Sequence, residues 1–511
     1  MPILEWLNKG EAIKTADRVP YRLLQADSEL SYGEPNGNML IKGDNLEALK
    51  ALLPYYKGQV KCIYIDPPYN TGSAFEKYDD NLEHSTWLSL LYPRLELLRE
   101  LLNENGLILI SIDDREHAYL KVICDEIFGR SNFVCTFIWE ARSGQGNTIG
   151  HIAENHEYIL CYAKNIQEVS FKKITNVANK GNYSDEKGSY KREQLRQWGQ
   201  GDRREDRPTM YYAVTAPSGE EIYPFRPDNT DGRWRVSKAK MDELIANNDV
   251  DFVKDENGRW LLYKKIRDGR VTYSAHGTLL TKIGTASTAT IELKELFLGI
   301  KIFDTPKPEV LIQHLLNLVT NENDLVLDSF LGSGTTAAVA HKMNRHYIGI
   351  EMGEHAITTS IPRLKAVIDG EQGGISKAVN WQGGGGFTFY DLGETVFDEN
   401  GNINPKVDFK TLASHIWFVE TKTPLLQCEK SPLLGVHNET AYYLLYNGIL
   451  GDKKVDGGNV LTSKIYEALP NPKEPFSGKK IIYGEASRLS SAKLKELNIT
   501  FKQTPYDVKA R

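Results

Sequence analysis

The chain has 511 residues, of which 41% are hydrophobic and 25% charged, values that exclude wholesale disorder, a collagen repeat and a coiled-coil rod. Its 68 Asp and Glu residues outnumber 62 Lys and Arg, so the chain as a whole is not a basic nucleic-acid-binding protein, although a local basic surface remains compatible with this balance. A length of about 150 residues per domain predicts roughly three domains.

The sequence gives no sign of a membrane segment or of a metal site. Its apolar runs fall short of the ~20 residues that cross a bilayer, and Met1–Trp6 lacks the pattern of a secretion signal. The five cysteines are scattered without a Cys-x-x-Cys pair. We therefore expect a soluble, cytoplasmic protein with neither a disulfide framework nor a bound metal.

The first part of the chain alternates predicted strands with predicted helices. Strands are predicted at residues 39–42, 60–65, 106–112 and 133–139, and helices at residues 45–53, 87–103 and 116–128. Strands that alternate with helices are typical of a parallel, doubly wound α/β sheet.

The character of the sequence changes near residue 141, where the Gly-rich stretch 142–150 indicates a boundary or a loop. Residues 171–270 contain 21 Lys and Arg against 17 Asp and Glu, a local positive excess in an acidic chain. Aromatic residues lie among these charges, including Tyr190, Trp198, Tyr211, Tyr212, Trp234 and Trp260. Basic and aromatic residues together suit a nucleic-acid-binding surface. A solvated α+β insertion of ordinary charge is the alternative interpretation.

The strand–helix alternation then returns, with a helix predicted at 309–319 and strands at 325–327 and 347–350. After Gly383–Gly386, predicted strands at 442–446 and 480–483 and a helix at 491–497 indicate a separate small α/β domain. An insertion thus interrupts the predicted sheet. The predicted divisions are an extension (1–38), two halves of one sheet domain (39–140 and 301–380), the insertion (141–300) and a C-terminal domain (381–511).

A Gly-rich turn follows the strand that ends at Asp328. Because Gly332 and Gly334 have no side chains, the backbone there can approach a ligand closely. Glu351 ends the next strand, where a carboxylate can accept hydrogen bonds from both hydroxyls of a ribose. The pattern suits an adenosine-containing cofactor, but it also fits the dinucleotide-binding turn of a dehydrogenase or a simple turn.

A second motif, Asp66-Pro67-Pro68-Tyr69, follows the strand 60–65 at the predicted carboxyl edge of the sheet, where open α/β sheets bind their ligands. Two prolines fix the backbone and remove two N–H donors, which leaves carbonyls such as that of Pro67 as acceptors. A carboxylate and a carbonyl can together hold the two N–H groups of an exocyclic amine on a heteroaromatic ring. The amine can then attack a methyl sulfonium directly, while Tyr69 stacks on a base rotated out of its duplex. A Pro-rich turn with a solvated Asp66 is the alternative.

With these motifs the chain resembles DNA amino-methyltransferases, and more closely the Mod subunits of Type III restriction–modification systems. The resemblance rests on Asp66–Gly72, Trp87–Leu95, Ile110–Asp114, Phe303–Pro308 and Asp328–Thr336, within residues 39–370 outside the insertion. It implies a Rossmann-like, doubly wound sheet of the S-adenosylmethionine-dependent methyltransferase type. The catalytic motif precedes the cofactor motif, as in the β class of this family, and the insertion corresponds to the target-recognition domain.

The resemblance also implies S-adenosyl-L-methionine as cofactor. The residues implied to hold it are Asp44, Thr305, Pro306, Lys307, Asp328, Phe330, Gly332, Gly334, Thr335 and Glu351. Asp44 would lie near the cofactor adenine, although a helix N-cap explains it equally well. We interpret Asp113 and Asp114 as solvated loop carboxylates and assign no role to His84.

Asp at the first motif position is the form that the family associates with the N6 amine of adenine, and N4-cytosine is the alternative target. C5-cytosine methylation needs a thiolate nucleophile, usually in Pro-Cys, and the sequence has no such dipeptide. The implied partners are double-stranded DNA, a second copy of the chain and a restriction subunit. Other possibilities are a stand-alone methyltransferase, a catalytically silent DNA-binding module and a Rossmann-type dehydrogenase.

Overall fold

The computed structural model describes residues 3–34, 36–70, 83–144, 152–177, 181–269, 271–398, 402–425, 429–472, 476–504 and 506–508. They form two compact units, the first made of residues 1–172 and 277–511 and the second of residues 173–276. Thr71 and Gly72 of the predicted catalytic motif and residues 145–150 of the Gly-rich stretch lie outside the described residues. The domain boundaries given above stay a prediction.

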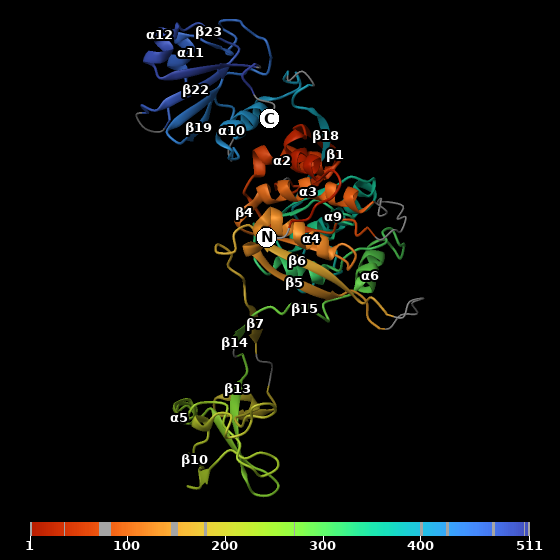
Figure 1. Ribbon diagram of the computed structural model, residues 1–511, viewed down its shortest axis with the longest axis vertical. Helices are drawn as coiled ribbons and strands as arrows, with labels where there is room; N and C mark the ends of the chain where they lie inside the picture. Colours follow the sequence, from red (N-terminus) through yellow and green to blue (C-terminus); the bar gives the residue numbers. More distant parts are fainter. Residues whose placement is uncertain are drawn as a thin grey trace. The chain divides into compact units, whose positions relative to one another are not determined.

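A ten-stranded sheet runs through the first unit in the order β1-β18-β2-β17-β16-β3-β4-β6-β5-β15 (Figure 1). Its strands are β1 (Arg22–Gly33), β2 (Met39–Lys42), β3 (Val60–Ile65), β4 (Leu102–Ile112), β5 (Phe133–Glu140), β6 (His156–Ala163), β15 (Leu279–Leu280), β16 (Leu325–Asp328), β17 (His346–Glu351) and β18 (Gly386–Thr395).

The sheet is mixed, which corrects the prediction of a parallel sheet. The six strands from β18 to β4 are parallel, but β1 is antiparallel to β18, and β6 is antiparallel to both β4 and β5. The strand β6 lies inside the range 141–300 that the sequence assigns to the insertion. Antiparallel neighbours need no crossover helix, so the strand–helix alternation on which the prediction rested does not mark β6.

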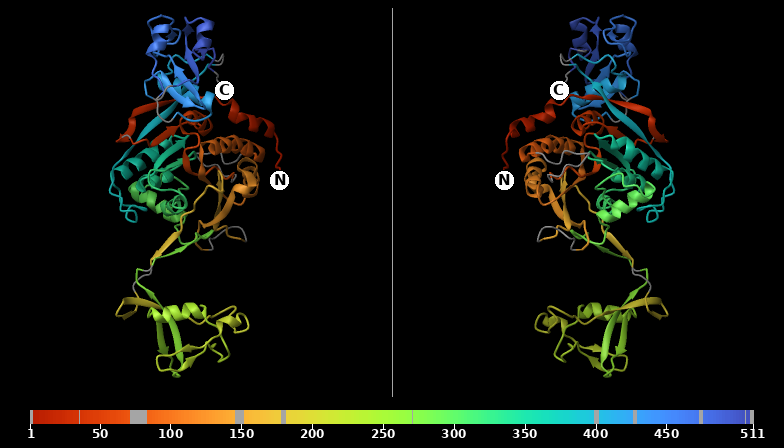
Figure 2. Two further views of the ribbon diagram at one scale, coloured as in Figure 1. Left: turned by 90° about the vertical axis from the view of Figure 1, so that its left-hand side faces the viewer. Right: turned by 90° about the vertical axis from the view of Figure 1, so that its right-hand side faces the viewer.

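Helices cover both faces of this sheet, and the doubly wound arrangement predicted from the sequence is confirmed (Figure 2). Along β2, Met39 and Ile41 belong to one apolar core while Leu40 belongs to the other, as the alternation of side chains along a strand requires. The first core is covered by α1 (Lys9–Arg18), α2 (Asn45–Tyr56), α3 (His84–Leu101) and α4 (His117–Cys124), and the second by α7 (Glu309–Leu316), α8 (Thr335–Lys342) and α9 (Ile361–Ile368).

Further helices in this part of the chain are η1 (Asp125–Gly129), η2 (Arg130–Asn132), α6 (Ala286–Leu296) and η4 (Ala356–Ser360). Among the described residues, no helix has both the length and the apolar character needed to cross a membrane.

The C-terminal residues do not separate from the large unit. They contain α10 (Phe409–Thr421), α11 (Ser463–Ala468), α12 (Ser491–Glu496), β19 (Leu433–His437), β20 (Thr440–Leu444), β21 (Val460–Leu461), β22 (Lys479–Gly484), β23 (Ala486–Ser487) and β24 (Ile499–Gln503). Strands β19, β20, β22 and β24 form a sheet of their own. However, Leu412 and Ile416 of α10 belong to the same apolar core as Leu49 of α2. A separate C-terminal domain is therefore not confirmed.

The second unit is a small α+β body with its own core. Its elements are β7 (Ile174–Val177), β8 (Tyr183–Asp185), β9 (Gly188–Gln194), η3 (Pro208–Met210), β10 (Val214–Thr215), β11 (Glu221–Ile222), α5 (Lys238–Ala246), β12 (Val250–Lys254), β13 (Trp260–Arg267) and β14 (Val271–Ser274). Strands β12, β13, β9 and β8 form an antiparallel sheet. Trp234, Met241 and Leu262 are buried in its core, so these 104 residues have the apolar interior of an independent body.

A buried ionic network lies beside α8 in the large unit. The Glu309 carboxylate pairs with Lys342 Nζ at 2.7 Å and with the Arg363 guanidinium at 2.9 Å, and these side chains are 0–4% exposed. Arg363 also donates to Thr335 Oγ1 at 2.7 Å, and Lys342 has a second carboxylate partner in Glu371. Glu309 therefore compensates two charges that are removed from water.

We expect Glu309→Ala to lower the free energy of unfolding by about 3–5 kcal/mol, because Arg363 would lose its buried carboxylate partner. Urea unfolding followed by circular dichroism measures this change. Glu295→Ala removes an exposed carboxylate from α6 and is the matched control, with an expected change of about 0.5 kcal/mol or less. Equal losses in the two variants would contradict the assignment of Glu309.

Candidate active site

The two predicted motifs meet in one cavity because β3 and β16 are parallel neighbours. Asp66 follows the last residue of β3 and Asp328 is the last residue of β16, so both lie at the same edge of the sheet. The cavity has a volume of about 360 Å³. Its lining includes the predicted residues Asp66, Pro67, Pro68, Tyr69, Thr305, Lys307, Asp328, Phe330, Gly332 and Thr335.

The other predicted cofactor residues, Asp44, Pro306, Gly334 and Glu351, are not among the described residues that line this cavity. Asp44 is the N-cap of α2: its carboxylate accepts from the Leu46 N–H at 2.7 Å and pairs with Arg94 at 3.1 Å. The N-cap interpretation is confirmed, and a role of Asp44 beside the cofactor stays a prediction.

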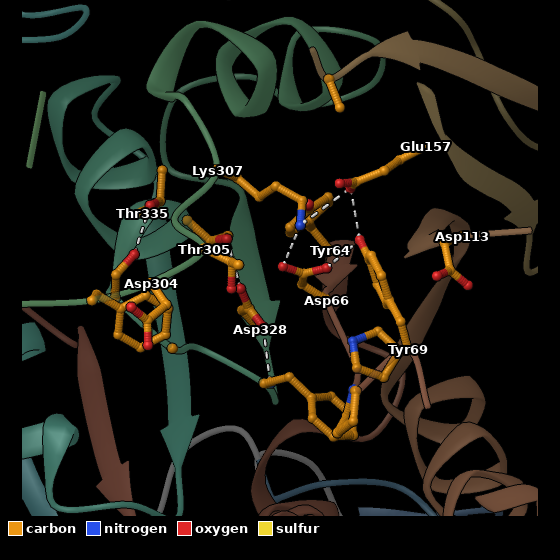
Figure 3. A pocket seen from close by; sticks show the side chains of 18 of the residues that line it. Tyr64, Asp66, Tyr69, Asp113, Glu157, Asp304, Thr305, Lys307, Asp328 and Thr335 are labelled. Atoms are coloured by element: carbon orange, nitrogen blue, oxygen red, sulfur yellow. Dashed lines mark hydrogen bonds and ion pairs between the residues drawn. The ribbon is translucent and has the colours of Figure 1, made fainter. Parts of the chain in front are cut away.

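Three side chains, those of Tyr69, Lys307 and Glu157, form a cluster with Asp66, the predicted acceptor of the amine (Figure 3). The Tyr69 hydroxyl lies 2.7 Å from Asp66 Oδ1 and 2.9 Å from Glu157 Oε2, and it can donate to either. Lys307 Nζ lies 2.6 Å from Asp66 Oδ2 and 3.4 Å from Glu157 Oε2. Lys307, to which the resemblance gave a role in cofactor binding, is thus paired with Asp66, the predicted catalytic carboxylate.

The electrostatics of this cluster fix the protonation of two groups. Burial lowers the pKa of Lys307, but the carboxylates of Asp66 and Glu157 outweigh burial, and the pKa is raised above its usual value. Burial raises the pKa of Tyr69 well above its usual value, and the same two carboxylates raise it further. Lys307 is therefore a cation and Tyr69 a neutral hydrogen-bond donor at physiological pH.

The Pro-Pro turn is held in place by α3. The indole Nε1 of the fully buried Trp87 donates to the Pro68 carbonyl at 2.8 Å. Asn70, which follows the motif, has a φ of 59° and donates to Glu116 at 2.8 Å, and His84 also bonds to Glu116 at 3.0 Å. These contacts give the motif a rigid support on its helix side.

The Gly-rich turn is held by two carboxylates. Asp328 accepts from the Phe330 N–H at 2.9 Å and from Thr336 Oγ1 at 2.6 Å. Glu351 accepts from the Gly332 N–H at 2.8 Å, and its other oxygen pairs with His355 at 3.0 Å. Burial raises the pKa of Glu351, but His355 outweighs it and the pKa lies below its usual value.

The turn leaves room for an adenosine-containing ligand. Gly332 has a φ of 55°, and a Cβ atom there would lie 3.1 Å from the Phe303 ring. Gly334 has a φ of 81°, which a residue with a side chain rarely adopts. The ring of Phe330 and the polar side chains of Asp304 and Thr305 line the same cavity. An aromatic face with nearby acceptors suits a purine and a charged amino-acid end.

Sequence reasoning missed Glu157, because it lies in the range assigned to the insertion. Since β6 is antiparallel to β4, the first residues of β6 lie at the edge where β3 and β4 end, with Tyr158 opposite Ile112. The only signal in the sequence was the position of a carboxylate immediately before an apolar run.

Asp113 also differs from its interpretation as a solvated carboxylate: it lines the cavity with a 17% exposed side chain paired with Arg115, whereas Asp114 is 57% exposed.

The family model described as DNA methylase of the N6/N4 class matches residues 60–362, more than half of the chain. The chain belongs to this DNA methylase family. The family resemblance predicted from the motifs is thereby confirmed, and the matched range contains the Asp66–Tyr69 motif and the Asp328–Thr336 turn.

Three relatives illustrate the range of similarity. The chain is 35% identical over 433 residues to a probable Type III restriction–modification Mod subunit, HindVI, of Haemophilus influenzae (75% of the chain, 58% of the relative). It is 35% identical over 421 residues to the EcoPI Mod subunit of Escherichia phage P1 (69% and 63%) and 31% identical over 338 residues to the Type II methyltransferase M.KpnI of Klebsiella pneumoniae (59% and 76%). The chain thus spans less than two thirds of the length of the two Mod subunits.

The Asp328 carboxyl gives a pH-dependent prediction. Burial raises its pKa from 3.8 to about 7, with the bonds from Thr336 and Phe330 opposing the shift. Between these values the folded chain holds a proton that the unfolded chain has released, so the free energy of unfolding falls as pH rises. We expect Asp328 to contribute a fall of about 2–3 kcal/mol between pH 5 and pH 7.

Asp328→Asn removes this titration and keeps an oxygen for the Phe330 N–H. Urea unfolding of both proteins at pH 5 and pH 7 therefore tests the prediction. The free energy of unfolding of the variant minus that of wild type should be about 2 kcal/mol larger at pH 7 than at pH 5. An unchanged difference between the two pH values would show that the pKa of Asp328 is not raised.

Proposed function

We propose that this chain is a site-specific DNA methyltransferase that transfers a methyl group from S-adenosyl-L-methionine to the N6 amine of an adenine. The observation that carries the proposal is the single cavity lined by both Asp66–Tyr69 and the turn from Asp328 to Thr336. A dehydrogenase has no use for the first motif, and a silent DNA-binding module has no use for either.

In this proposal Asp66 and the Pro67 carbonyl hold the two N–H groups of the amine. Hydrogen bonds to these acceptors raise the electron density on a nitrogen whose lone pair is otherwise delocalised into the ring. Tyr69 directly follows the two prolines and supplies an aromatic face on which a base rotated out of the DNA duplex can stack. The proton released from the amine passes to the Asp66 carboxylate.

The residues present fit S-adenosyl-L-methionine. Phe330 offers a ring for the adenine, Thr305 and Asp304 offer polar groups, and the positive φ of Gly332 and Gly334 sets the shape of the turn. When bound, the cofactor supplies an electrophilic methyl group on a sulfonium. Glu351 and Asp328 hold the turn from within, since their oxygens already accept from Gly332, Phe330 and Thr336.

We further propose that the chain is the modification subunit of a Type III system, which acts on double-stranded DNA, forms a homodimer and pairs with a restriction subunit. Two relatives named Type III Mod subunits, at 35% identity, support the role of a modification subunit that pairs with a restriction subunit. A stand-alone Type II enzyme is the second candidate, favoured by the 76% of M.KpnI that the chain covers. Purification of the tagged chain from its own cells, with analysis of co-purified proteins, separates the two candidates.

Single-molecule sequencing of DNA from cells that express the chain tests the reaction itself. N6-methyladenine at one recurring sequence is the expected result. N4-methylcytosine would correct the target base, and unmodified DNA from cells with folded protein would overturn the proposal.

We expect Asp66→Asn to lower kcat for methyl transfer by about 10²–10⁴-fold, because the amide presents a weaker acceptor to the amine. The Kd for S-adenosylmethionine should stay within about threefold of wild type, because Asp66 does not hold the cofactor. Tritium transfer to DNA and calorimetry measure the two quantities. Asp114→Asn, which removes an exposed carboxylate near the same edge, is the control and should retain activity.

Residues 173–276 should determine which DNA sequence is modified, because they form a compact unit of their own with exposed aromatic side chains such as Trp198 and Tyr273. We expect an exchange of this unit for that of a relative to change the methylated sequence and to leave the modified atom unchanged. Sequencing of methylated DNA from cells that express the chimera reports both. A folded, active chimera with the original sequence preference would place recognition in the large unit.

A further inference from the structure

Both oxygens of the Asp66 carboxylate already have a partner in this structure. Its Oδ1 accepts from the Tyr69 hydroxyl at 2.7 Å and its Oδ2 pairs with Lys307 Nζ at 2.6 Å. A cation at this distance draws electron density from the carboxylate and weakens it as an acceptor. Asp66 is therefore a stronger acceptor for the amine when Lys307 has moved away from it.

Lys307 cannot move into an apolar space, because its side chain is only 9% exposed and an unpaired buried charge is costly. The pKa of Lys307 is raised by its carboxylate neighbours, so loss of its proton does not offer another route. The cation needs a second carboxylate within reach.

Glu157 is that carboxylate. Its Oε2 lies 3.4 Å from Lys307 Nζ and 2.9 Å from the Tyr69 hydroxyl, on the opposite side of these two donors from Asp66 (Figure 3). Glu157 is on β6, whose pairing with β4 and β5 holds it at this edge of the sheet. Nζ lies 2.6 Å from Asp66 and 3.4 Å from Glu157, so an approach to Glu157 by the difference between these distances gives Glu157 the contact that Asp66 now has.

We propose that Glu157 is a positioning residue that takes over both Lys307 and the Tyr69 hydroxyl when the target amine reaches Asp66. The inference rests on the proposed function, because it concerns the same amine. Glu157 touches neither base nor cofactor in this role. It keeps the buried cation paired in both arrangements, so that Asp66 is released as an acceptor without loss of the charge balance of the cavity.

The test compares three variants in steady-state and single-turnover methylation of DNA by the full chain. Glu157→Gln keeps the shape and an acceptor for Tyr69 but removes the charge that holds Lys307, and we expect kcat to fall about 100-fold with the KM for DNA and for S-adenosylmethionine within about threefold. Glu157→Asp keeps the charge and should recover at least about tenfold of this loss. Glu140→Gln, on the neighbouring strand β5 and outside the cavity lining, is the control and should behave as wild type.

Three outcomes overturn the proposal: a kcat of Glu157→Gln within about threefold of wild type, a loss confined to KM, and equal losses in the Gln and Asp variants. Inactivity of the wild-type chain would instead overturn the proposed function, so the two failures are distinguishable.

A second measurement applies even if Glu157→Gln does not fold alone. In a Lys307→Met background the cation is absent, so adding Glu157→Gln should cost almost nothing further in the single-turnover rate. A further loss of about tenfold or more in the double variant would overturn the role of Glu157 as the alternative partner of Lys307.

Discussion

The parallel pairing of β3 with β16 is the constraint on which the site depends. It places Cys62 beside Val326 and Ile63 beside Leu327, so the residues that follow these strands emerge at one edge. Residues 66 and 328 are distant in the sequence, and neither motif has a ligand-binding shape without the other. The pairing of two buried apolar strands thus sets the distance between the polar motifs at their ends.

The charged side chains beside the Gly-rich turn and those around Asp66 are paired in different ways. Beside the Gly-rich turn, Glu309, Lys342 and Arg363 form a closed set in which buried charges have fixed partners. Around Asp66, two carboxylates share one cation and one hydroxyl, so each of these donors has two acceptors within reach. The first set holds its charges in fixed pairs beside the predicted cofactor turn, and the second offers alternative partners beside the predicted catalytic motif.

Much of this site could be predicted from the sequence, because its main motifs follow apolar strands and carry unusual backbone residues. Asp66-Pro67-Pro68-Tyr69 and the Gly332 turn both have such signals. Glu157 has no such signal. It is at the start of an antiparallel strand, and one amino-acid sequence alone does not show in which direction a strand runs in the sheet. Lys307 was found but was placed with the cofactor, because its distance from Asp66 depends on side-chain packing rather than on sequence spacing.

The strand order also has a consequence for how the chain folds. β16 and β17 lie between β3 and β2, although more than 250 residues separate β3 from β16 along the chain. The hydrogen bonds of the middle of the sheet therefore form only after a long loop has closed, which slows folding. During synthesis, the edges of β2 and β3 that later pair with β17 and β16 keep unpaired backbone N–H and C=O groups until residues 325–351 have been made. Any fragment that ends before Leu325 retains those two edges, and exposed edges of this kind lead to aggregation.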